Sequence, residues 1–380
     1  MRPAKGRGSI VSLGSAVAIA AGLVLLVAGA EALVRGASRL ATALGISPLI
    51  IGLTVVAFGT STPELAVGAQ AALDGQTELA MGNVTGSNQF NMLGVLGVSA
   101  LISVLLVRQK LVRRELPLLV GVSALVFVVA LGGEIARWEG ALLIIGLVAY
   151  TVWAILVERR GGESEEVEAE YEAEVSSGRS WHWSVNVVLV AAGLALLVLG
   201  SRWLVNGAVD IATDLGMSEL LVGVTIVAIG TSLPELATSL VAAYRREGDI
   251  AVGNVVGSNL FNLLGVLGLS ALLSPIGVPV SSQALNFQLP GLIVVSLLAL
   301  GIFRTRMAIH RWEGVALLAL YAVYLGYSIV EATGSASLGV VQVIAAVSVI
   351  GVGAAVMVTT RLDRQRLAAA GETPPSLGGD

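Results

Sequence analysis

One long internal repeat limits the folds that this chain can adopt. Residues 45–103 align with residues 216–274 without a gap at a constant offset of 171 positions, and 34 of these 59 positions are identical. The similarity reaches further along the chain, because the sequence Arg-Trp-Glu-Gly at residues 137–140 returns at residues 311–314. We therefore predict a fold made of two equivalent halves.

Apolar runs of about twenty residues occur along nearly the whole chain, and each is long enough to cross a bilayer as a helix. Of the 380 residues, 56% are hydrophobic and 13% are charged, whereas an ordinary soluble domain has roughly 25% charged residues. With 5% aromatic residues and 46 glycines, the composition favours helices packed through small residues over a lipid-facing barrel. The sequence therefore predicts an all-α integral membrane protein.

The composition also argues against several kinds of site. There is no cysteine for a disulfide or a thiolate metal centre, and two histidines do not favour an imidazole centre. The net charge of −4 is too small to indicate a nucleic-acid partner. We predict a protein of the lipid bilayer that is not an enzyme and has no cofactor, and the sequence leaves its oligomeric state open.

The apolar runs divide each half into five predicted spans, and one further span follows. These are residues 10–42, 48–72, 78–105, 115–133 and 138–157, then 184–213, 219–243, 249–274, 286–303 and 312–331, and finally 336–360. Because five is an odd number, the second half must enter the membrane from the opposite side. The predicted fold class is thus an inverted repeat of two five-helix halves plus one extra C-terminal transmembrane helix. Such repeats are common in secondary transporters, which bind their substrate where the halves meet.

The loop charges predict an orientation, because cytoplasmic loops carry an excess of Lys and Arg. The basic residues gather on the side that places the N-terminus outside and the C-terminus in the cytoplasm. The predicted segments are 1–157 (first repeat), 158–182 (acidic cytoplasmic linker), 183–331 (second repeat), 332–360 (extra helix) and 361–380 (cytoplasmic tail). The linker has eight glutamates and is predicted to be solvated, with a regulatory divalent-cation site as the alternative. The short loops indicate a prokaryotic plasma (inner) membrane.

Two carboxylates lie inside predicted spans, where an ionisable group is costly unless it is paired or hydrated. Glu64 and Glu235 are equivalent in the repeat. Each belongs to a polar stripe at the spacing i, i+3, i+4, i+7, which places four residues on one helical face. The stripes are Ala57, Thr60, Ser61 and Glu64 in the first half, and Ala228, Thr231, Ser232 and Glu235 in the second. A buried structural carboxyl is the competing interpretation, and its duplication in two identical contexts disfavours it.

A proline precedes each of these glutamates. Pro63 and Pro234 remove an amide donor and clash with the carbonyl one turn earlier, which opens the helix there. Freed backbone carbonyls at membrane depth are tolerated only where they are buried or line a cavity. Carboxylate, hydroxyl and carbonyl oxygens at one level form a site for hard cations such as Ca²⁺ and Na⁺.

The next span of each half carries a second polar stripe at the spacing i, i+4, i+8. The residues are Asn83, Ser87 and Asn91, then Asn254, Ser258 and Asn262. Asn and Ser among glycines can also be hydrogen-bonding contacts between helices. We predict that Ser87, Ser258, Asn91 and Asn262 belong to the site and that Asn83, Asn88, Asn254 and Asn259 are structural. Glu31, whose repeat partner is Arg202, is predicted to pair with Arg35 one turn along and to be structural.

These motifs resemble the α-1 and α-2 repeats of the Ca²⁺/cation antiporter superfamily, most closely its prokaryotic sodium/calcium exchanger branch. The resemblance covers about residues 10–331 and rests on Gly59–Glu64 with Gly82–Asn91, and on Gly230–Glu235 with Gly253–Asn262. It implies a sodium/calcium exchanger-like fold with ten core spans. The run 336–360 lies outside that core and is assigned no transport role.

The resemblance also implies a role for each site residue. Glu64 and Glu235 would share Ca²⁺, with Thr60, Ser61, Thr231 and Ser232 supplying hydroxyl or carbonyl oxygens. Ala57 and Ala228 would give backbone carbonyls to Na⁺, Ser87 and Ser258 would complete those sites, and Asn91 and Asn262 would flank the centre. Some relatives, the K⁺-dependent exchangers among them, have Asp at the positions of Asn91 or Asn262, so the two amides here disfavour K⁺ coupling.

The predicted function is Na⁺/Ca²⁺ antiport by alternating access, with two carboxylates that hold one Ca²⁺ or several Na⁺ but not both. The alternatives are an H⁺/Ca²⁺ exchanger, in which the glutamates carry protons, and a cation channel. The inverted repeat favours a carrier over a channel.

Overall fold

The apolar runs and their breaks produce the helices that the spacing predicts. The computed structural model describes residues 13–160, 183–217, 222, 225–226, 228–333 and 338–369. The N-terminal residues 1–12, residues 161–182 of the predicted linker and the end of the predicted tail lie outside the described residues. So do most residues at the start of the predicted span 219–243.

Both halves have the same order of elements from the broken helix onward, within the residues that the structure describes. In the first half these are α1 (Leu13–Leu44), α2 (Pro48–Ile51), the π-helical turn η1 (Gly52–Val56), α3 (Ala57–Thr60), α4 (Thr62–Leu73), α5 (Thr77–Gln89), η2 (Phe90–Val95), α6 (Leu96–Ile102), β1 (Leu105–Leu106), η3 (Leu111–Glu115), α7 (Leu116–Ala130), β2 (Glu134–Ile135) and α8 (Arg137–Arg160). In the second half they are α10 (Trp183–Asp214), α12 (Ala228–Gly230), α13 (Leu233–Tyr244), α14 (Gly248–Phe261), η5 (Asn262–Val266), α15 (Leu267–Leu273), β3 (Val278–Pro279), η6 (Ala284–Gln288), α16 (Leu289–Arg306), β4 (Ala308–Ile309) and α17 (Arg311–Ala332). The additional helix α18 spans Leu338–Ala369.

The helices have the length and composition of membrane spans. Among the described residues, six helices are apolar and long enough to cross a membrane: α1, α8, α10, α17 and the runs 248–273 and 284–304. The segment Pro48–Leu73 adds a seventh if its two helices, which meet at 46°, form one bent span. The protein is therefore a multi-pass membrane protein, as the sequence predicts.

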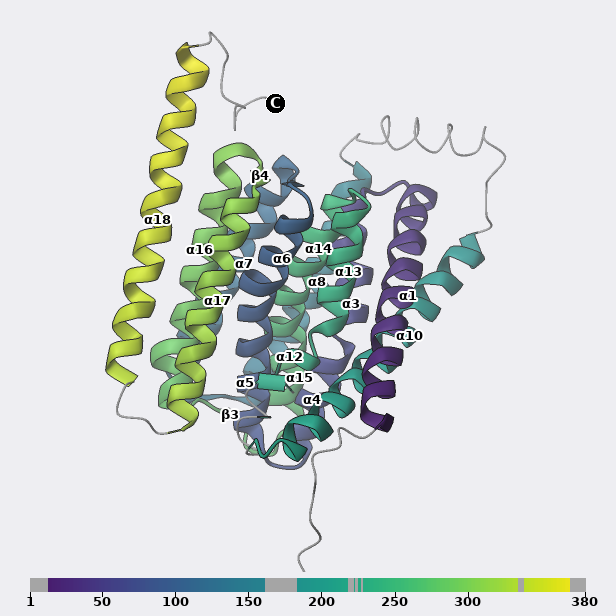
Figure 1. Cartoon of the computed structure of the whole chain (residues 1–380), viewed down its shortest axis with the longest axis vertical. Coiled ribbons are helices and arrows are strands. Elements are labelled where there is room, and N and C mark those ends of the chain that lie inside the picture. Colours follow the sequence, from purple (N-terminus) through teal and green to yellow (C-terminus); the bar gives the residue numbers. More distant parts are fainter. Residues whose placement is uncertain are drawn as a thin grey trace, which may run out of the picture.

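Contacts between the halves occur as reciprocal pairs. At the repeat offset of 171, Gly97 corresponds to Gly268. Gly140 corresponds to Gly314 through the repeated Arg-Trp-Glu-Gly sequence, which returns 174 positions later. A Cβ on Gly97 would meet the Gly314 carbonyl oxygen, and a Cβ on Gly140 would meet that of Gly268. The strands repeat this pattern, because β1 pairs antiparallel with β4 and β2 pairs antiparallel with β3. The two ribbons lie at opposite ends of the molecule (Figure 1), which is consistent with the predicted inverted repeat.

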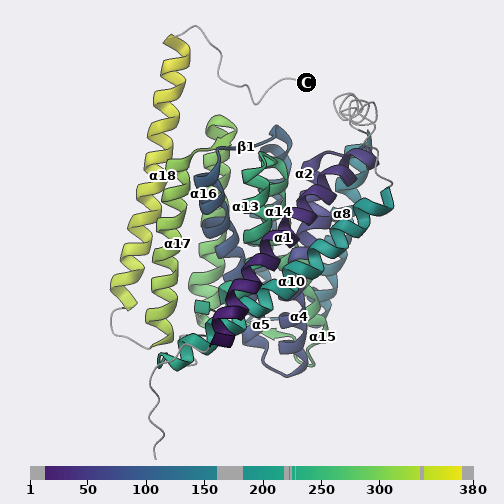
Figure 2. The same ribbon diagram turned by 45° about the vertical axis from the view of Figure 1, so that its right-hand side comes forward.

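Helices α1 and α10 cross each other on one side of this core (Figure 2). Gly29 lies against the Gly193 carbonyl and Gly22 lies against the Gly200 carbonyl, so the two helices run antiparallel. Gly22 and Gly193 are equivalent in the repeat, as are Gly29 and Gly200. Close approach therefore depends on four glycines that meet in two equivalent contacts.

The repeated Arg-Trp-Glu-Gly sequence begins a helix in each half. The Glu139 carboxylate accepts a hydrogen bond from the Ala136 amide (2.8 Å), and the Glu313 carboxylate accepts one from the His310 amide (2.8 Å). A glutamate in the first turn that binds an amide just before the helix stabilises the helix N-terminus. The motif thus caps α8 and α17, and its glycine allows the close packing described above.

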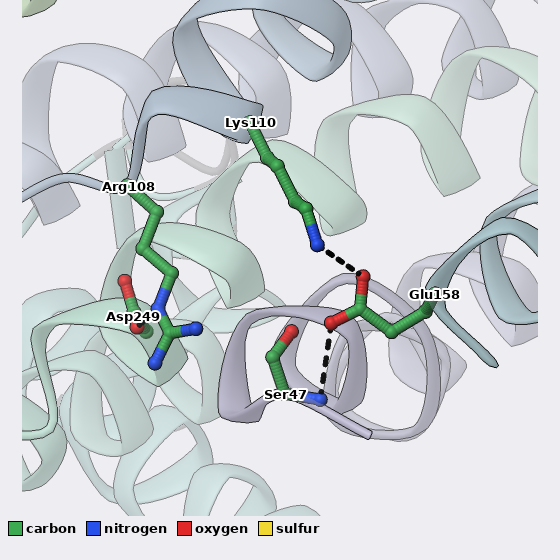
Figure 3. A network of polar contacts seen from close by, with 5 residues as sticks. All are labelled: Ser47, Arg108, Lys110, Glu158 and Asp249. Carbon is green, nitrogen blue, oxygen red and sulfur yellow. Dashed lines mark hydrogen bonds and ion pairs between the residues drawn. The ribbon is translucent and has the colours of Figure 1, made fainter. Parts of the chain in front are cut away.

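Polar contacts hold the N-terminus of α2, the helix that leads to Glu64. Glu158 near the end of α8 accepts hydrogen bonds from the Ser47 amide (3.2 Å) and from Lys110 (3.1 Å), while Arg108 contacts Asp249 at 2.5 Å (Figure 3). Ser47 and Glu158 are buried. These contacts join α2, α8, α14 and the loop before η3 at one end of the molecule.

Helix α18 packs along α17 and α16, on the opposite side from α1 and α10 (Figures 1 and 2). Its apolar side chains Val343, Val347 and Ile350 are exposed, as expected for residues that face lipid. No predicted site residue belongs to α18.

Candidate cation site

The helix that carries Glu64 is broken in the middle of the membrane domain. Helix α3 ends at Thr60 and α4 begins at Thr62, and Ser61 between them has φ −81° and ψ 8°. Ser232, the equivalent residue, has φ −90° and ψ 10°. A proline follows each break within the first two positions of the next helix, where its missing N–H costs nothing. The polar stripe is thus not one continuous helical face, because the proline divides it between two helices.

The broken helices bring the two carboxylates together through their serines. Ser232 donates a hydrogen bond to Glu64 Oε1 (2.8 Å), and Ser61 donates one to Glu235 Oε1 (2.9 Å). All four residues are fully buried. Each serine therefore serves the carboxylate of the other half, and neither half forms the centre alone.

One oxygen of each carboxylate lacks a partner. Glu64 Oε2 and Glu235 Oε2 are buried, and neither accepts a hydrogen bond. Within the part of the chain that the structure describes, no basic side chain forms an ion pair with Glu64 or Glu235. An unpaired buried charge is costly, so the arrangement suits a cation that neutralises both groups.

The hydroxyl groups around the centre differ between the halves. Thr60 donates to Asn254 Oδ1 (3.0 Å) and lies 3.4 Å from Ser258 Oγ, and Ser258 donates to Glu235 Oε1 (3.3 Å). The hydroxyl oxygens of the equivalent residues Thr231 and Ser87 are buried without a hydrogen-bond partner. The first set is thus hydrogen-bonded, while the second is free to coordinate a cation.

The remaining predicted residues also lie at the helix breaks. The Ala57 carbonyl accepts a hydrogen bond from the Ser61 amide (3.0 Å) and lies 3.3 Å from the Thr60 hydroxyl oxygen. Ala228 begins α12, directly before the second break. Asn91 and Asn262 lie in the π-helical turns η2 and η5 and are fully buried.

The asparagines predicted to be structural contact backbone carbonyls. Asn83 donates to the Glu64 carbonyl (3.1 Å), and Asn254 donates to the Glu235 carbonyl (3.2 Å). Asn88 and Asn259 each donate to the backbone carbonyl of the other, at 3.3 and 3.4 Å. These two residues are equivalent in the repeat, so each half makes the same contact with the other half.

Sequence reasoning missed the π-helical turns and the direct contacts of α10 with both breaks. A Cβ on Gly59 would clash with Leu194, and one on Gly230 would clash with Val205. Ser201 also donates to the Gly230 carbonyl (2.6 Å). The glycine before each Thr-Ser pair was a signal of such close approach, but only the fold identifies α10 as the neighbour of both.

A cavity of about 430 Å³ lies between α10 and the first break. It is lined by Phe58, Gly59, Thr62, Leu194, Ala195, Val198, Leu199 and Arg202. A larger cavity of about 810 Å³ opens near β1, beside Arg108 and Asp249, and no predicted site residue lines it. The smaller cavity therefore reaches the residues next to Thr60 and Ser61.

Comparison with protein families agrees with this geometry. The family model described as sodium/calcium exchanger protein matches residues 14–156 and 185–330. These segments cover both repeats and exclude the predicted linker and α18. The chain belongs to the sodium/calcium exchanger family.

Individual relatives are similar over most of their length. The putative antiporter CaxA of Alkalimonas amylolytica is 40% identical over 246 residues, which are 64% of this chain and 76% of that protein. The inner membrane protein YrbG of Escherichia coli is 37% identical over 250 residues, 64% of this chain and 75% of that protein. The solved structure of the sodium-calcium exchanger NCX_Mj matches with a TM-score of 0.71 and 31% identity, and covers 83% of this chain and 98% of that one. The predicted sodium/calcium exchanger-like fold is confirmed.

Proposed function

We propose that this protein is a secondary active antiporter that exchanges Na⁺ for Ca²⁺ by alternating access. The observation that carries the proposal is the pair of buried carboxylates, Glu64 and Glu235, each with one oxygen bound by a serine of the other half and one oxygen without a partner. Membership of the sodium/calcium exchanger family supports the same class of substrate.

Shared oxygens explain why the ions exchange. One Ca²⁺ neutralises both carboxylates, and Na⁺ ions at the same oxygens do so in its place, so the two kinds of ion compete. Ser61 and Ser232 would add oxygens to the centre, as would Thr60 and Thr231. The free hydroxyls of Ser87 and Thr231 and the carbonyls of Ala57 and Ala228 would contribute to Na⁺ binding. Hard oxygen ligands of this kind suit both cations.

Both halves are needed for the centre, which ties ion binding to the contact between them. Without a cation, two negative charges remain in a low-dielectric interior. The empty carrier would therefore change its conformation less readily than the loaded one, which prevents leak. In the proposed cycle α1 and α10 move against the core, since α10 covers both helix breaks.

The proposed location is a prokaryotic plasma (inner) membrane, with the N-terminus outside and the C-terminus in the cytoplasm. The similarity to an inner membrane protein of Escherichia coli supports this location. The proposed division keeps the two repeats (1–157 and 183–331), the linker 158–182, the extra helix 332–360 and the tail 361–380, with two boundaries moved. Helix α8 continues to Arg160, so residues 158–160 belong to the first repeat, and α18 continues to Ala369, inside the predicted tail.

Calcium uptake into proteoliposomes tests the coupling ion. Vesicles loaded with Na⁺ and diluted into Na⁺-free medium should accumulate ⁴⁵Ca²⁺, and a protonophore should leave the initial rate unchanged. Vesicles with a pH gradient and no Na⁺ should accumulate no more than protein-free vesicles. Uptake driven by the pH gradient alone would show H⁺/Ca²⁺ exchange instead, and ⁴⁵Ca²⁺ flux without any counter-ion would show a channel.

A further inference from the structure

The side-chain amide of Asn262 is held in one orientation by a chain of hydrogen bonds. The chain begins at the backbone carbonyl of Asn259, which can only accept, so the nitrogen of the Asn88 amide must face it (3.3 Å). The Asn88 oxygen therefore points the other way and accepts from Asn262 Nδ2 (3.1 Å). This leaves Asn262 Oδ1 as the free end of its amide.

The free oxygen of Asn262 has the surroundings of a cation ligand. Asn262 is fully buried, and its Oδ1 has no hydrogen-bond donor. Asn262 follows Ser258 by four residues, and Ser258 donates a hydrogen bond to Glu235 Oε1 (3.3 Å). Residues four apart lie on the same face of a helix, so the Asn262 side chain lies on the face that carries the carboxylate contact.

We propose that Asn88 is a positioning residue that keeps the carbonyl oxygen of Asn262, and not its NH₂ group, directed at the transported cation. An amide can rotate by 180° about its last bond with little change in shape, and a cation would then meet a donor. The hydrogen bond from Asn262 to Asn88 prevents this rotation. The inference rests on the proposed function, because it concerns a ligand of the same centre.

The equivalent residues of the other half are not locked in this way. Asn259 Oδ1 and both polar atoms of the Asn91 amide are buried without a partner, although Asn259 donates to the Asn88 carbonyl (3.4 Å). Only one of the two equivalent amides is therefore fixed in this conformation.

A double-mutant cycle separates positioning from packing. Asn88→Ala should raise the apparent KM for Ca²⁺ by about fivefold, the effect of losing one hydrogen bond, with little change in kcat. In an Asn262→Asp background both ends of the side chain are oxygens, so Asn88→Ala should no longer raise KM. An equal rise in both backgrounds would mean that Asn88 only supports packing, and the proposal would be wrong.

A substitute variant and a wild-type control complete the experiment. If Asn88→Ala does not fold, Asn88→Ser takes its place in the cycle, because serine is too short to reach both partners. Wild-type protein without Na⁺-driven Ca²⁺ uptake would contradict the proposed function, whereas normal wild-type uptake with equal mutant effects contradicts only the role of Asn88.

A second inference comes from charges at the two ends of α1 and α10. Arg245, at the end of α13, forms an ion pair with Glu31 of α1, with Arg245 Nε 2.6 Å from Glu31 Oε2. The predicted pair of Glu31 with Arg35 is also present, at 2.5 Å. At the repeat offset of 171, Glu31 corresponds to Arg202 and Arg245 corresponds to Asp74. Both signs are reversed, so the equivalent pair would again be attractive.

The equivalent pair is open in this conformation. Among the described residues no ion pair joins Arg202 to Asp74, and Asp74 accepts a hydrogen bond from Gln70 instead (2.9 Å). Helix α1 packs along α13, whereas α10 makes few contacts with α4. Arg202 lines the 430 Å³ cavity beside the first helix break.

We infer that the two pairs are alternate locks, with Glu31–Arg245 closing one end and Arg202–Asp74 closing the other. Movement of α1 and α10 together would break the first pair and form the second, and this would close the cavity beside Thr62. On this proposal Glu31 has a role in gating in addition to the predicted structural pair with Arg35, because the sign change at Arg202 is matched by the sign change at Asp74.

Disulfide cross-linking tests the alternate locks, and the absence of native cysteine leaves no competing thiols. The double variants Glu31→Cys with Arg245→Cys, and Arg202→Cys with Asp74→Cys, should both cross-link in membranes when oxidised. Each cross-link should stop Ca²⁺ uptake, and reductant should restore it. The control pair Trp203→Cys with Asp74→Cys, one position along α10, should cross-link much more slowly.

The outcomes are distinct from those of the transport proposal. Failure of the Arg202/Asp74 pair to cross-link, under conditions in which the Glu31/Arg245 pair does, would overturn the alternate locks. The cross-links form or fail whichever ions the protein carries.

Discussion

Replacing Glu64 by glutamine should reduce Na⁺-driven Ca²⁺ uptake by roughly a hundredfold or more. The carboxylate of Glu64 is fully buried, so in the proposed function it forms a buried charge pair with the bound cation. Removing one partner of such a pair costs about 3–5 kcal/mol. The hydrogen bond from Ser232 can persist in the variant, because the glutamine oxygen also accepts. The expected loss is therefore in cation binding, measured as the initial rate of ⁴⁵Ca²⁺ uptake and as Ca²⁺-dependent thermal stabilisation in detergent.

A matched control for this variant is Glu115→Gln. Glu115 is a buried carboxylate outside the proposed site, and it accepts a hydrogen bond from the Tyr150 hydroxyl (2.7 Å). Glutamine can accept the same bond, so uptake should stay near that of the wild type. Near-normal uptake by Glu64→Gln, or an equal loss in both variants, would remove the assignment of Glu64 as a ligand.

Valine at position 193 should lower uptake by roughly tenfold, because overpacking a tight contact costs about 1–3 kcal/mol. A Cβ on Gly193 would lie 2.7 Å from the Leu33 amide nitrogen and 2.8 Å from the Gly29 carbonyl oxygen. Both are backbone atoms that cannot rotate away, so α1 and α10 must separate. Since α10 covers both helix breaks, the change should reach the proposed cation site from a distance.

Gly121→Val is the control for this second variant. Gly121 lies on the exposed side of α7, where a Cβ would meet no atom within 4 Å. It should keep both the uptake rate and the thermal unfolding midpoint of the wild type. Equal effects of the two substitutions would show that glycine content matters, and not the crossing of α1 and α10.

The sequence predicts the helices and the two broken segments well because local physics determines them. Runs of apolar residues must form helices in a bilayer, where backbone groups find no other partners, and Pro63 and Pro234 cannot stand inside a continuous helix without opening it, so each stands at the start of a new helix. The predicted ends of α8 and α10 therefore lie within a few residues of the observed ones.

Contacts between distant segments could not be predicted in this way. Spacing along one helix paired Glu31 with Arg35, but it could not reveal Arg245, which is 214 positions away. The amide orientation of Asn262 depends on Asn88 in the other half, and no local pattern distinguishes a π-helical turn from an α-helical one. The repeat offset already related Glu31 to Arg202, and the same offset relates Asp74 to Arg245. That second sign reversal gained meaning only once the structure showed the contact of Glu31 with Arg245.

The two short strand ribbons have a mechanical consequence. Each ribbon joins a loop of one half to a loop of the other, β1 with β4 at one end and β2 with β3 at the opposite end. They fix the loops between the core helices at both ends, so the core behaves as a frame whose ends are tied. Helices α1 and α10 contribute no strand to either ribbon. In the proposed cycle, α1 and α10 could therefore move past the proposed binding centre while the distances between its ligands stay nearly constant.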